Sequence, residues 1–170
     1  MKRKFKPLSQ GAGNCDGNND IKLSHLRVHA VSLGCPKNRV DTEQLLARLA
    51  GVAGLQGLTL TLVDHPDAAD LVLVNTCAFI QPAEKESVGT ILELAQRLTA
   101  REPRPPLVVA GCLPTRYGAA TLAPDLPEVD LWAPLESYDA WPEAVARLLG
   151  IAPGPATPGV ATAICTETMP

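Results

Sequence analysis

Three cysteines, Cys35, Cys77 and Cys112, each follow a short apolar run that predicts a buried strand. The runs are residues 28–33, 71–74 and 107–110, and each cysteine is followed by residues that begin a turn or a helix. Thiolates are soft ligands of the kind that hold zinc or iron–sulfur clusters. Their placement at the ends of separate strands therefore indicates a metal site rather than a framework of disulfides.

The number of cysteines narrows the choice of metal. A structural zinc site needs four ligands, usually as two C-x-x-C pairs, and the sequence contains no such pair. An iron–sulfur cluster accepts cysteines from distant loops, and three of them on a four-iron cluster leave one iron without a protein ligand. The alternative is that the three are small buried apolar residues, as free cysteines often are. Cys15 and Cys165 are expected to be exposed and incidental.

Composition and charge argue against two classes of partner. The 170 residues carry a formal net charge of −3 and have a pI near 5.6, so the strongly basic footprint of a nucleic-acid-binding protein is absent. No stretch approaches the roughly 20 apolar residues of a membrane span, and no apolar signal region follows the basic start of the chain. We expect a cytoplasmic protein, where thiols stay reduced, and an odd number of cysteines does not form a closed set of disulfides.

The hydrophobic pattern alternates between strands and helices in the middle of the chain. Strands are predicted at residues 27–33, 58–63, 70–76, 107–111 and 129–132. Helices are predicted at residues 38–50, 82–100 and 141–149, with a short helix within residues 114–122. Gly51 and Gly54 are expected to break the first helix. The core-facing stripe of the second helix is predicted to contain Val88, Ile91, Leu92, Ala95 and Leu98.

This alternation predicts an α/β domain, in which a mostly parallel sheet of about five strands is covered by helices on both faces. Such a domain has a flavodoxin-like or Rossmann-like three-layer fold, and we expect the strand order 2-1-3-4-5. In that order the three strands that precede the cysteines are neighbours, and ligands of open α/β sheets bind at the carboxyl ends of the strands. The domain is predicted to span residues 27–150, between a disordered tail at 1–26 and a linker or truncated end at 151–170.

The segments around the cysteines carry recognisable motifs. The first reads Ser-Leu-Gly-Cys-Pro-Lys-Asn-Arg-Val-Asp-Thr-Glu at residues 32–43, and the second reads Val-Asn-Thr-Cys-Ala-Phe-Ile at residues 74–80, followed by Ala83, Glu86 and Ser87. The third reads Gly-Cys-Leu at residues 111–113, followed by Arg116 and Tyr117. Together, in this order and at this spacing, they resemble the N-terminal domain of the radical-SAM methylthiotransferase family over roughly residues 27–150.

The resemblance implies a cofactor and a reaction. Cys35, Cys77 and Cys112 would hold an auxiliary 4Fe-4S cluster whose open iron carries the sulfur that becomes a methylthio group. The Gly-Cys-Pro-Lys-Asn form at residues 34–38 is similar to the branch that modifies the β-carbon of an aspartate in small-subunit ribosomal protein S-twelve. The tRNA-directed branch more typically has Gly-Cys-Gln-Met-Asn. S-adenosylmethionine and a second 4Fe-4S cluster are the further implied cofactors, and ribosomal protein S-twelve or the ribosome is the implied partner.

The sequence departs from the family in one respect. Family members continue into a radical-SAM barrel with a C-x-x-x-C-x-x-C motif and then into a TRAM domain, and neither is present in these 170 residues. We therefore expect a fragment that has no catalytic residue of its own and that has the missing domains as partners. Two alternatives stay open: an iron–sulfur-binding module without catalytic output, and the N-terminal domain of a tRNA-directed enzyme.

Four polar residues near the cysteines are candidates for supporting the cluster. Asn38, Asn75, Thr76 and Arg116 are placed to line the pocket or to donate hydrogen bonds to cluster sulfurs. The alternative for Asn38 is ordinary helix capping. For Asn75 and Thr76 the alternative is that they satisfy loop backbone, and for Arg116 it is a solvated position on a short helix.

Overall fold

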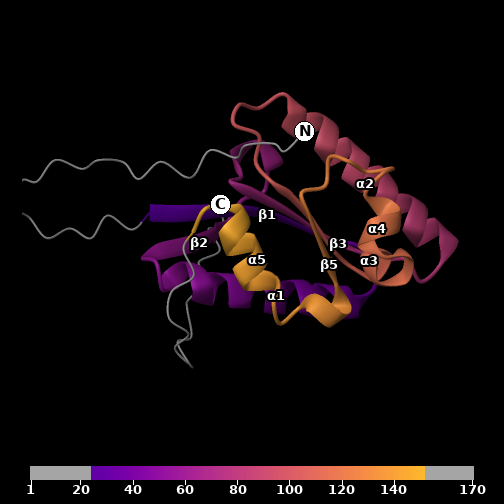
Figure 1. Ribbon diagram of the computed structural model, residues 1–170, viewed down its shortest axis with the longest axis horizontal. Helices are drawn as coiled ribbons and strands as arrows, with labels where there is room; N and C mark the ends of the chain where they lie inside the picture. The colour runs from indigo at the N-terminus through magenta and orange to yellow at the C-terminus, as the bar shows by residue number, and fades with distance from the viewer. Residues whose placement is uncertain (1–23, 152–170) are drawn as a thin grey trace, which may run out of the picture.

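The sheet at the centre of the molecule confirms the predicted fold class and strand order. The computed structural model describes residues 24–151, and within them five strands pair in the order β2-β1-β3-β4-β5, all parallel (Figure 1). The strands are β1 (Ser24–Ser32), β2 (Leu58–Leu62), β3 (Leu71–Thr76), β4 (Leu107–Gly111) and β5 (Leu131–Pro134). Most of the two predicted tails, residues 1–23 and 152–170, lies outside the described residues.

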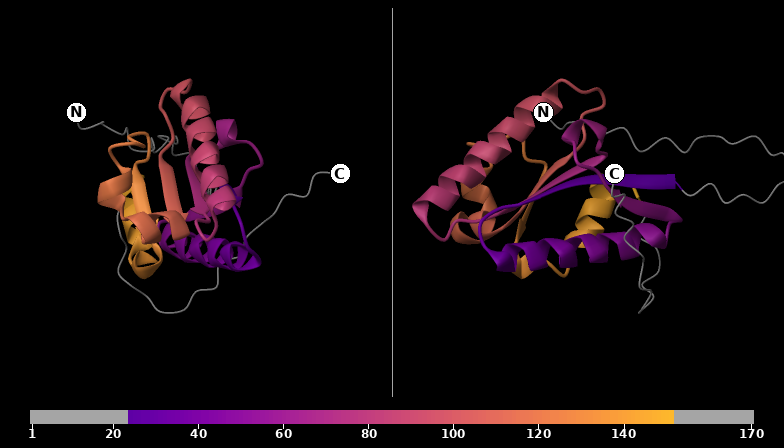
Figure 2. Two further views of the ribbon diagram at one scale, coloured as in Figure 1. Left: turned by 90° about the vertical axis from the view of Figure 1, so that its right-hand side faces the viewer. Right: turned by 180° about the vertical axis from the view of Figure 1, so that it is seen from behind.

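Helices cover both faces of this sheet (Figure 2). The helices α1 (Pro36–Gly54) and α5 (Trp141–Leu148) pack on one face. On the other face lie α2 (Gln81–Thr99), α3 (Cys112–Tyr117) and α4 (Ala119–Leu122). Short 3-10 turns at Pro66–Ala68 and Leu135–Ser137 complete the connections. No helix in residues 24–151 combines the length and the apolarity that crossing a membrane requires.

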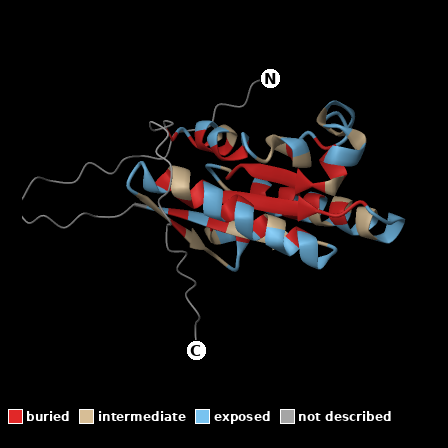
Figure 3. Ribbon diagram, turned by 90° about the horizontal axis from the view of Figure 1, so that it is seen from below, coloured by how far each residue is buried: buried red, intermediate tan, exposed pale blue. Residues whose placement is uncertain are grey.

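Strands β3 and β4 correspond to the segments of the sequence that are continuously apolar rather than alternating. Every residue of β3 and β4 is buried, because helices cover both faces of the sheet there (Figure 3). The edge strands β2 and β5 are mostly half-buried. Cys77 and Cys112 therefore follow the two most completely buried strands, whereas Cys35 follows β1, in which buried and exposed residues are mixed.

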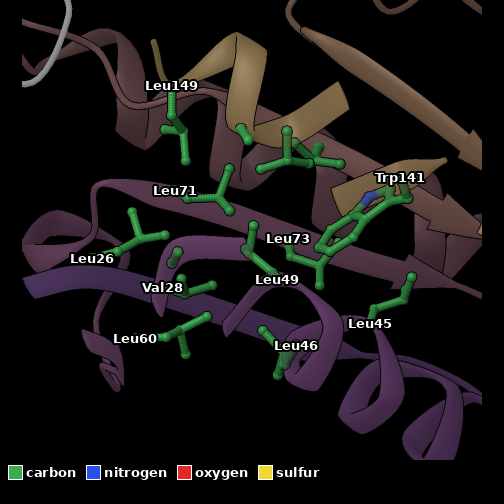
Figure 4. Packing of buried hydrophobic residues seen from close by; sticks show 14 of the residues in the cluster. Leu26, Val28, Leu45, Leu46, Leu49, Leu60, Leu71, Leu73, Trp141 and Leu149 are labelled. Atoms are coloured by element: carbon green, nitrogen blue, oxygen red, sulfur yellow. The ribbon is translucent and has the colours of Figure 1, made fainter. Parts of the chain in front are cut away.

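The core between the sheet and the pair α1 and α5 is built mainly from leucine (Figure 4). Trp141, at the start of α5, is 1% exposed and packs among these side chains, and its indole Nε1 has no hydrogen-bond partner within the described residues. Each buried leucine stabilises the fold by roughly 1.5–3 kcal/mol. Apolar packing thus holds α1 against the sheet and fixes the start of α1 near the carboxyl edge. The labelled members of the cluster are Leu26, Val28, Leu45, Leu46, Leu49, Leu60, Leu71, Leu73, Trp141 and Leu149.

Several predicted element boundaries differ from the structure. Strand β1 begins at Ser24, within the predicted tail 1–26, and α1 begins at Pro36 rather than at residue 38. Helix α1 continues through Gly51 to Gly54, because Ala50 and Ala53 are buried against the sheet and offset the roughly 1 kcal/mol by which a helical glycine is disfavoured. The single short helix expected within residues 114–122 is two helices, α3 and α4, which meet at Gly118 with φ +79°. Strand β5 begins at Leu131 rather than at residue 129.

The buried stripe of α2 also differs from the prediction. Leu92 is 48% exposed, and Leu94 is buried in its place. The buried positions of α2 are 87, 91, 94, 95 and 98. They follow the helical period more closely than a stripe that includes residue 92, which lies about 100° from residue 91. The stripe also contains a polar residue, Ser87, which is completely buried.

Candidate metal centre

The carboxyl ends of β1, β3 and β4 meet at one edge of the sheet (Figure 1). Ser32 pairs with Asn75, and Thr76 pairs with Gly111, so the three strands end almost level. The connections that carry Cys35, Cys77 and Cys112 begin directly beyond these pairs. The predicted convergence of the three strand ends is therefore confirmed, whereas the role of the thiols as metal ligands stays a prediction.

The three cysteines differ in exposure. Cys77 is buried at 5% exposed, Cys112 is half-buried and Cys35 is exposed. The buried Ser87 side chain in α2 fixes the backbone of Cys77: its hydroxyl accepts a hydrogen bond from the Cys77 N–H at 3.0 Å and donates one to the Cys77 carbonyl at 2.8 Å. One hydroxyl thus satisfies both buried backbone groups of this cysteine.

Two glycines allow the neighbouring loops to approach the end of β3. Gly34 has φ +83°, and a Cβ atom at this position would lie 2.3 Å from the Cys77 Cβ and 2.6 Å from its Sγ. Gly111 has φ +95°, and a Cβ atom there would lie 2.2 Å from the Asn75 Oδ1. A residue with a side chain fits neither the backbone conformation nor the space. The residues directly before Cys35 and Cys112 therefore pack against the central strand.

Asn38 ties the first loop to the central strand. Its Nδ2 donates hydrogen bonds to the Leu33 carbonyl at 2.8 Å and to the Thr76 carbonyl at 2.9 Å, and the side chain is only 2% exposed. The helix-capping alternative is wrong, because the residue at the N-cap of α1 is Cys35 and no side chain there caps a backbone N–H. Asn38 holds two loop carbonyls side by side instead.

Asn75 and Thr76 also bind neighbouring elements. Asn75 Nδ2 donates to the Asn38 carbonyl at 2.8 Å and to the Thr42 hydroxyl at 3.0 Å. Thr76 Oγ1 donates to the Ala110 carbonyl at 2.6 Å and accepts from the Leu113 N–H at 3.2 Å. Both side chains are 0% exposed. Satisfaction of backbone, the alternative given for these residues, is what the contacts show.

Arg116 links the third loop to the second. Its Nη1 donates to the Ala78 carbonyl at 2.6 Å, and its guanidinium carbon lies 5.4 Å from the centroid of the Tyr117 ring. The Tyr117 hydroxyl donates to Glu84 Oε2 at 2.8 Å, and this hydrogen bond is the main reason that the pKa of Tyr117 is raised. Arg116 is an exposed residue, yet its guanidinium is held against the residue that follows Cys77.

Sequence reasoning assigned no role to two residues of this edge. Ser87 had a detectable signal, since it is a polar residue on an otherwise apolar helix stripe. Tyr138 had none, because it lies in the connection after β5 and meets Asn75 only through the fold, with 3.5 Å between its hydroxyl and the Asn75 Oδ1. Burial raises the pKa of Tyr138, and the negative charges of Asp41 and Cys112 raise it further.

The donor set fits an iron–sulfur cluster in its chemistry. Three cysteine thiols on three loops, with a closed polar network behind them, are suited to hold a cluster that keeps one iron open. Within residues 24–151, no three Cys, His, Asp or Glu side chains are grouped as they would be around a metal ion. Loading would therefore require the exposed Cys35 and the half-buried Cys112 to turn toward the fixed Cys77.

Comparison with known proteins gives the family. Residues 27–134 match the family described as "Uncharacterized protein family UPF0004". The ribosomal protein uS12 methylthiotransferase RimO of Nitratidesulfovibrio vulgaris (strain DP4) is 50% identical over 134 residues, which are 79% of this chain and 29% of that protein. Proteins of the same name from Lawsonia intracellularis and Oleidesulfovibrio alaskensis are 48% and 51% identical, over 74% and 75% of this chain and 27% and 28% of those proteins.

The match covers less than a third of the length of these curated relatives. Among solved structures, an orphan response regulator of H. pylori superposes with a TM-score of 0.43 and 14% identity, over 73% of this chain and 96% of that chain. The match of residues 27–134, which includes all three cysteines of the sheet edge, shows that this chain belongs to the UPF0004 family.

Proposed function

We propose that this chain forms the cluster-binding, sulfur-donating domain of a methylthiotransferase, with Cys35, Cys77 and Cys112 as the ligands of one 4Fe-4S cluster. The observation that carries the proposal is the convergence of three cysteine-bearing strand ends on one sheet edge, in a chain of this family. When bound, such a cluster would supply an iron without a protein ligand, to which sulfur can attach.

The residues at this sheet edge would have different roles in binding the cluster. Cys77 would be the fixed ligand, since the Ser87 hydroxyl and the core hold its backbone. Cys35 and Cys112 would complete the ligand set from the outer loops. Asn38 and Thr76 would keep the three loops in register and would exclude water from behind the site, because their polar atoms are taken up by backbone groups.

The names of the relatives support the ribosomal-protein branch over the tRNA-directed one. The relatives named above are ribosomal protein uS12 methylthiotransferases. We propose by this likeness that the acceptor is an aspartate of that ribosomal protein, modified at its β-carbon. S-adenosylmethionine and a second cluster would bind in a radical-SAM domain. This domain and a TRAM domain would act together with the present one in the cytoplasm, where the thiols stay reduced.

Anaerobic reconstitution of the purified chain with iron and sulfide tests the cluster. The expected result is about four irons and four sulfides per chain, with the visible absorption of an iron–sulfur cluster. Cys35→Ala, Cys77→Ala and Cys112→Ala should each lose this loading. Cys15→Ala and Cys165→Ala, which change cysteines beyond the described residues, serve as controls that should keep it.

Two results would overturn the proposal. The first is a folded chain that takes up no iron, and the second is full loading in Cys35→Ala. A further experiment addresses the reaction, by adding radical-SAM and TRAM domains of a relative in trans and measuring the mass of ribosomal protein uS12. Methylthiolation that depends on this chain would exclude an inert iron–sulfur module, and modification of tRNA in its place would support the tRNA-directed alternative.

A further inference from the structure

Lys37 lies on the open side of the cysteine edge. It is the second residue of α1, directly after Pro36, and its side chain is 70% exposed. Its ammonium is 2.6 Å from Asp41 Oδ2 one helical turn later. The hydrogen bond to Asp41 is the main reason that the pKa of Lys37 is raised, and the charges of Asp41, Cys112 and Cys35 add to it. Lys37 lies two residues after Cys35, in the first turn of the helix that begins at the cysteine edge.

Fold stability does not explain a lysine at this position. The N-terminal turn of a helix favours negative charge, and a cation there opposes the helix dipole. The first turn of α1 contains no acidic residue. The pair with Asp41 has the lysine on the N-terminal side, which is the less favourable order for an i,i+4 pair. A lysine at position 37 is therefore less favourable for the stability of α1 than an acidic residue would be.

The proposed chemistry needs a cation at this place. Three thiolates give the site a negative charge, and an acceptor aspartate is also negative, so the two repel each other as they approach. A lysine ammonium between them reduces this repulsion and binds the carboxylate through a charge-assisted hydrogen bond. Because the lysine side chain is 70% exposed and an ammonium has three N–H donors, an incoming carboxylate can bind it beside Asp41 or in the place of Asp41.

Neighbouring cations are less suited to this task. The guanidinium of Arg116 is bonded to the Ala78 carbonyl and lies over the Tyr117 ring. Arg39 is two positions after Lys37, which places it about 200° around the helix, and it pairs with Glu43 at 3.5 Å. Among these three cations, Lys37 combines an exposed side chain with a position two residues after Cys35.

We propose that Lys37 is a specificity-determining residue that receives the carboxylate of the acceptor side chain, so that the site selects an acidic peptide. Asp41 would hold the ammonium over the edge when no acceptor is bound. This inference rests on the proposed function, because the acceptor aspartate comes from it. Lys37 would bind and orient the acceptor, while the three cysteines would hold the cluster.

Binding of two synthetic peptides tests the inference. Both copy the acceptor loop of ribosomal protein uS12, one with the acceptor aspartate and one with asparagine at that position. Calorimetry on the full chain, with and without reconstituted cluster, should show about tenfold tighter binding of the aspartate peptide, as expected for one charge-assisted contact. Lys37→Met, which keeps the length of the side chain without its charge, should reduce this preference to less than about twofold, and Lys37→Arg should keep it.

Lys85→Met is the matched control, since Lys85 is an exposed lysine near the start of α2 and its loss changes the net charge equally. This variant should keep the full preference for the aspartate peptide. An unchanged preference in Lys37→Met overturns the inference, and so does equal or absent binding of the two peptides by the unaltered chain. Iron and sulfide are counted in every sample, so a failure to load the cluster is recorded separately from a failure of Lys37 to select the carboxylate.

Discussion

The loops that carry Cys77 and Cys35 lie at the same edge of the sheet but are held in different ways. The Cys77 backbone is fixed from α2 by Ser87, and its side chain is buried against Gly34. Cys35 is exposed at the N-cap of α1, and no side chain caps the helix there. If the cysteines act as proposed, one ligand would be set by the core and one would adjust when a cluster binds. Each of the following predictions tests whether the edge is divided in this way.

Gly111→Ala should have the largest effect on stability, because it disrupts the close packing of Gly111 against the end of β3. The new Cβ would collide with the Asn75 Oδ1 and the Thr76 carbonyl at a φ of +95°. We expect the free energy of unfolding to fall by roughly 3 kcal/mol, measured by urea denaturation. Gly118→Ala is the control, since Gly118 also has positive φ (79°, with ψ 140°) but open space around it, and it should lose less, about 1–2 kcal/mol. Equal losses would mean that the close approach at Gly111 contributes nothing.

Thiol alkylation should separate the two loops directly. In the apo chain, iodoacetamide should modify Cys35 on the order of 100-fold faster than Cys77, because Cys77 reacts only when the structure opens locally. The sites are read by peptide mass mapping after timed quenching. In urea the two rates should become similar. Comparable rates in the folded chain would show that Cys77 is not held by the core.

Ser87→Ala removes the clamp on Cys77 without changing a thiol. The Cys77 N–H and carbonyl would be left buried without partners, which should lower the free energy of unfolding by about 2 kcal/mol. Thr99→Ala, at an exposed position of the same helix, should change it by less than about 0.5 kcal/mol. Alkylation of Cys77 should also accelerate in Ser87→Ala and not in Thr99→Ala. A stable variant with an unchanged alkylation rate would exclude the clamp.

The pH dependence of stability should report the packing of Tyr138 behind the edge. Burial raises the pKa of this phenol above the ordinary value of 10.0, so the folded chain keeps its proton when the unfolded chain has lost it. Stability from this group is fully present below the unfolded pKa and is lost as pH rises toward the folded one, by less than about 1.4 kcal/mol per pH unit. The unfolding free energies of the unaltered chain and of Tyr138→Phe, compared from pH ~9 to ~11, should therefore diverge as pH rises. Parallel curves would count against the burial of the phenol.

Phe79→Ser should have the smallest effect on stability, because the Phe79 side chain lies at the solvent-exposed side of the sheet edge. Phe79 is 87% exposed, directly after the buried residues Cys77 and Ala78. The free energy of unfolding should change by less than about 0.5 kcal/mol, measured by urea denaturation. A loss of more than about 1 kcal/mol would show that the buried core extends past Ala78 and includes Phe79.

The features that depend on hydrophobic periodicity and on where strands end could be predicted from the sequence. Continuous apolar runs predicted β3 and β4, and alternation with helices predicted the sheet order that brings Cys35, Cys77 and Cys112 to one edge. The end of α1 was predicted too early, since the burial of Ala53 that sustains the helix past Gly51 depends on the sheet beneath it. The contact of Tyr138 with Asn75 joins residues from distant segments, and no local pattern contains it.

The parallel sheet has a consequence for how the protein is made. Parallel strands pair only after the chain has crossed over between them, so β4 cannot dock beside β3 until α2 and the segment after it have left the ribosome. Before that moment a nascent chain presents Cys35 and Cys77 without Cys112 beside them. If the three cysteines act as proposed, iron and sulfide would meet the complete ligand set only after β4 has docked.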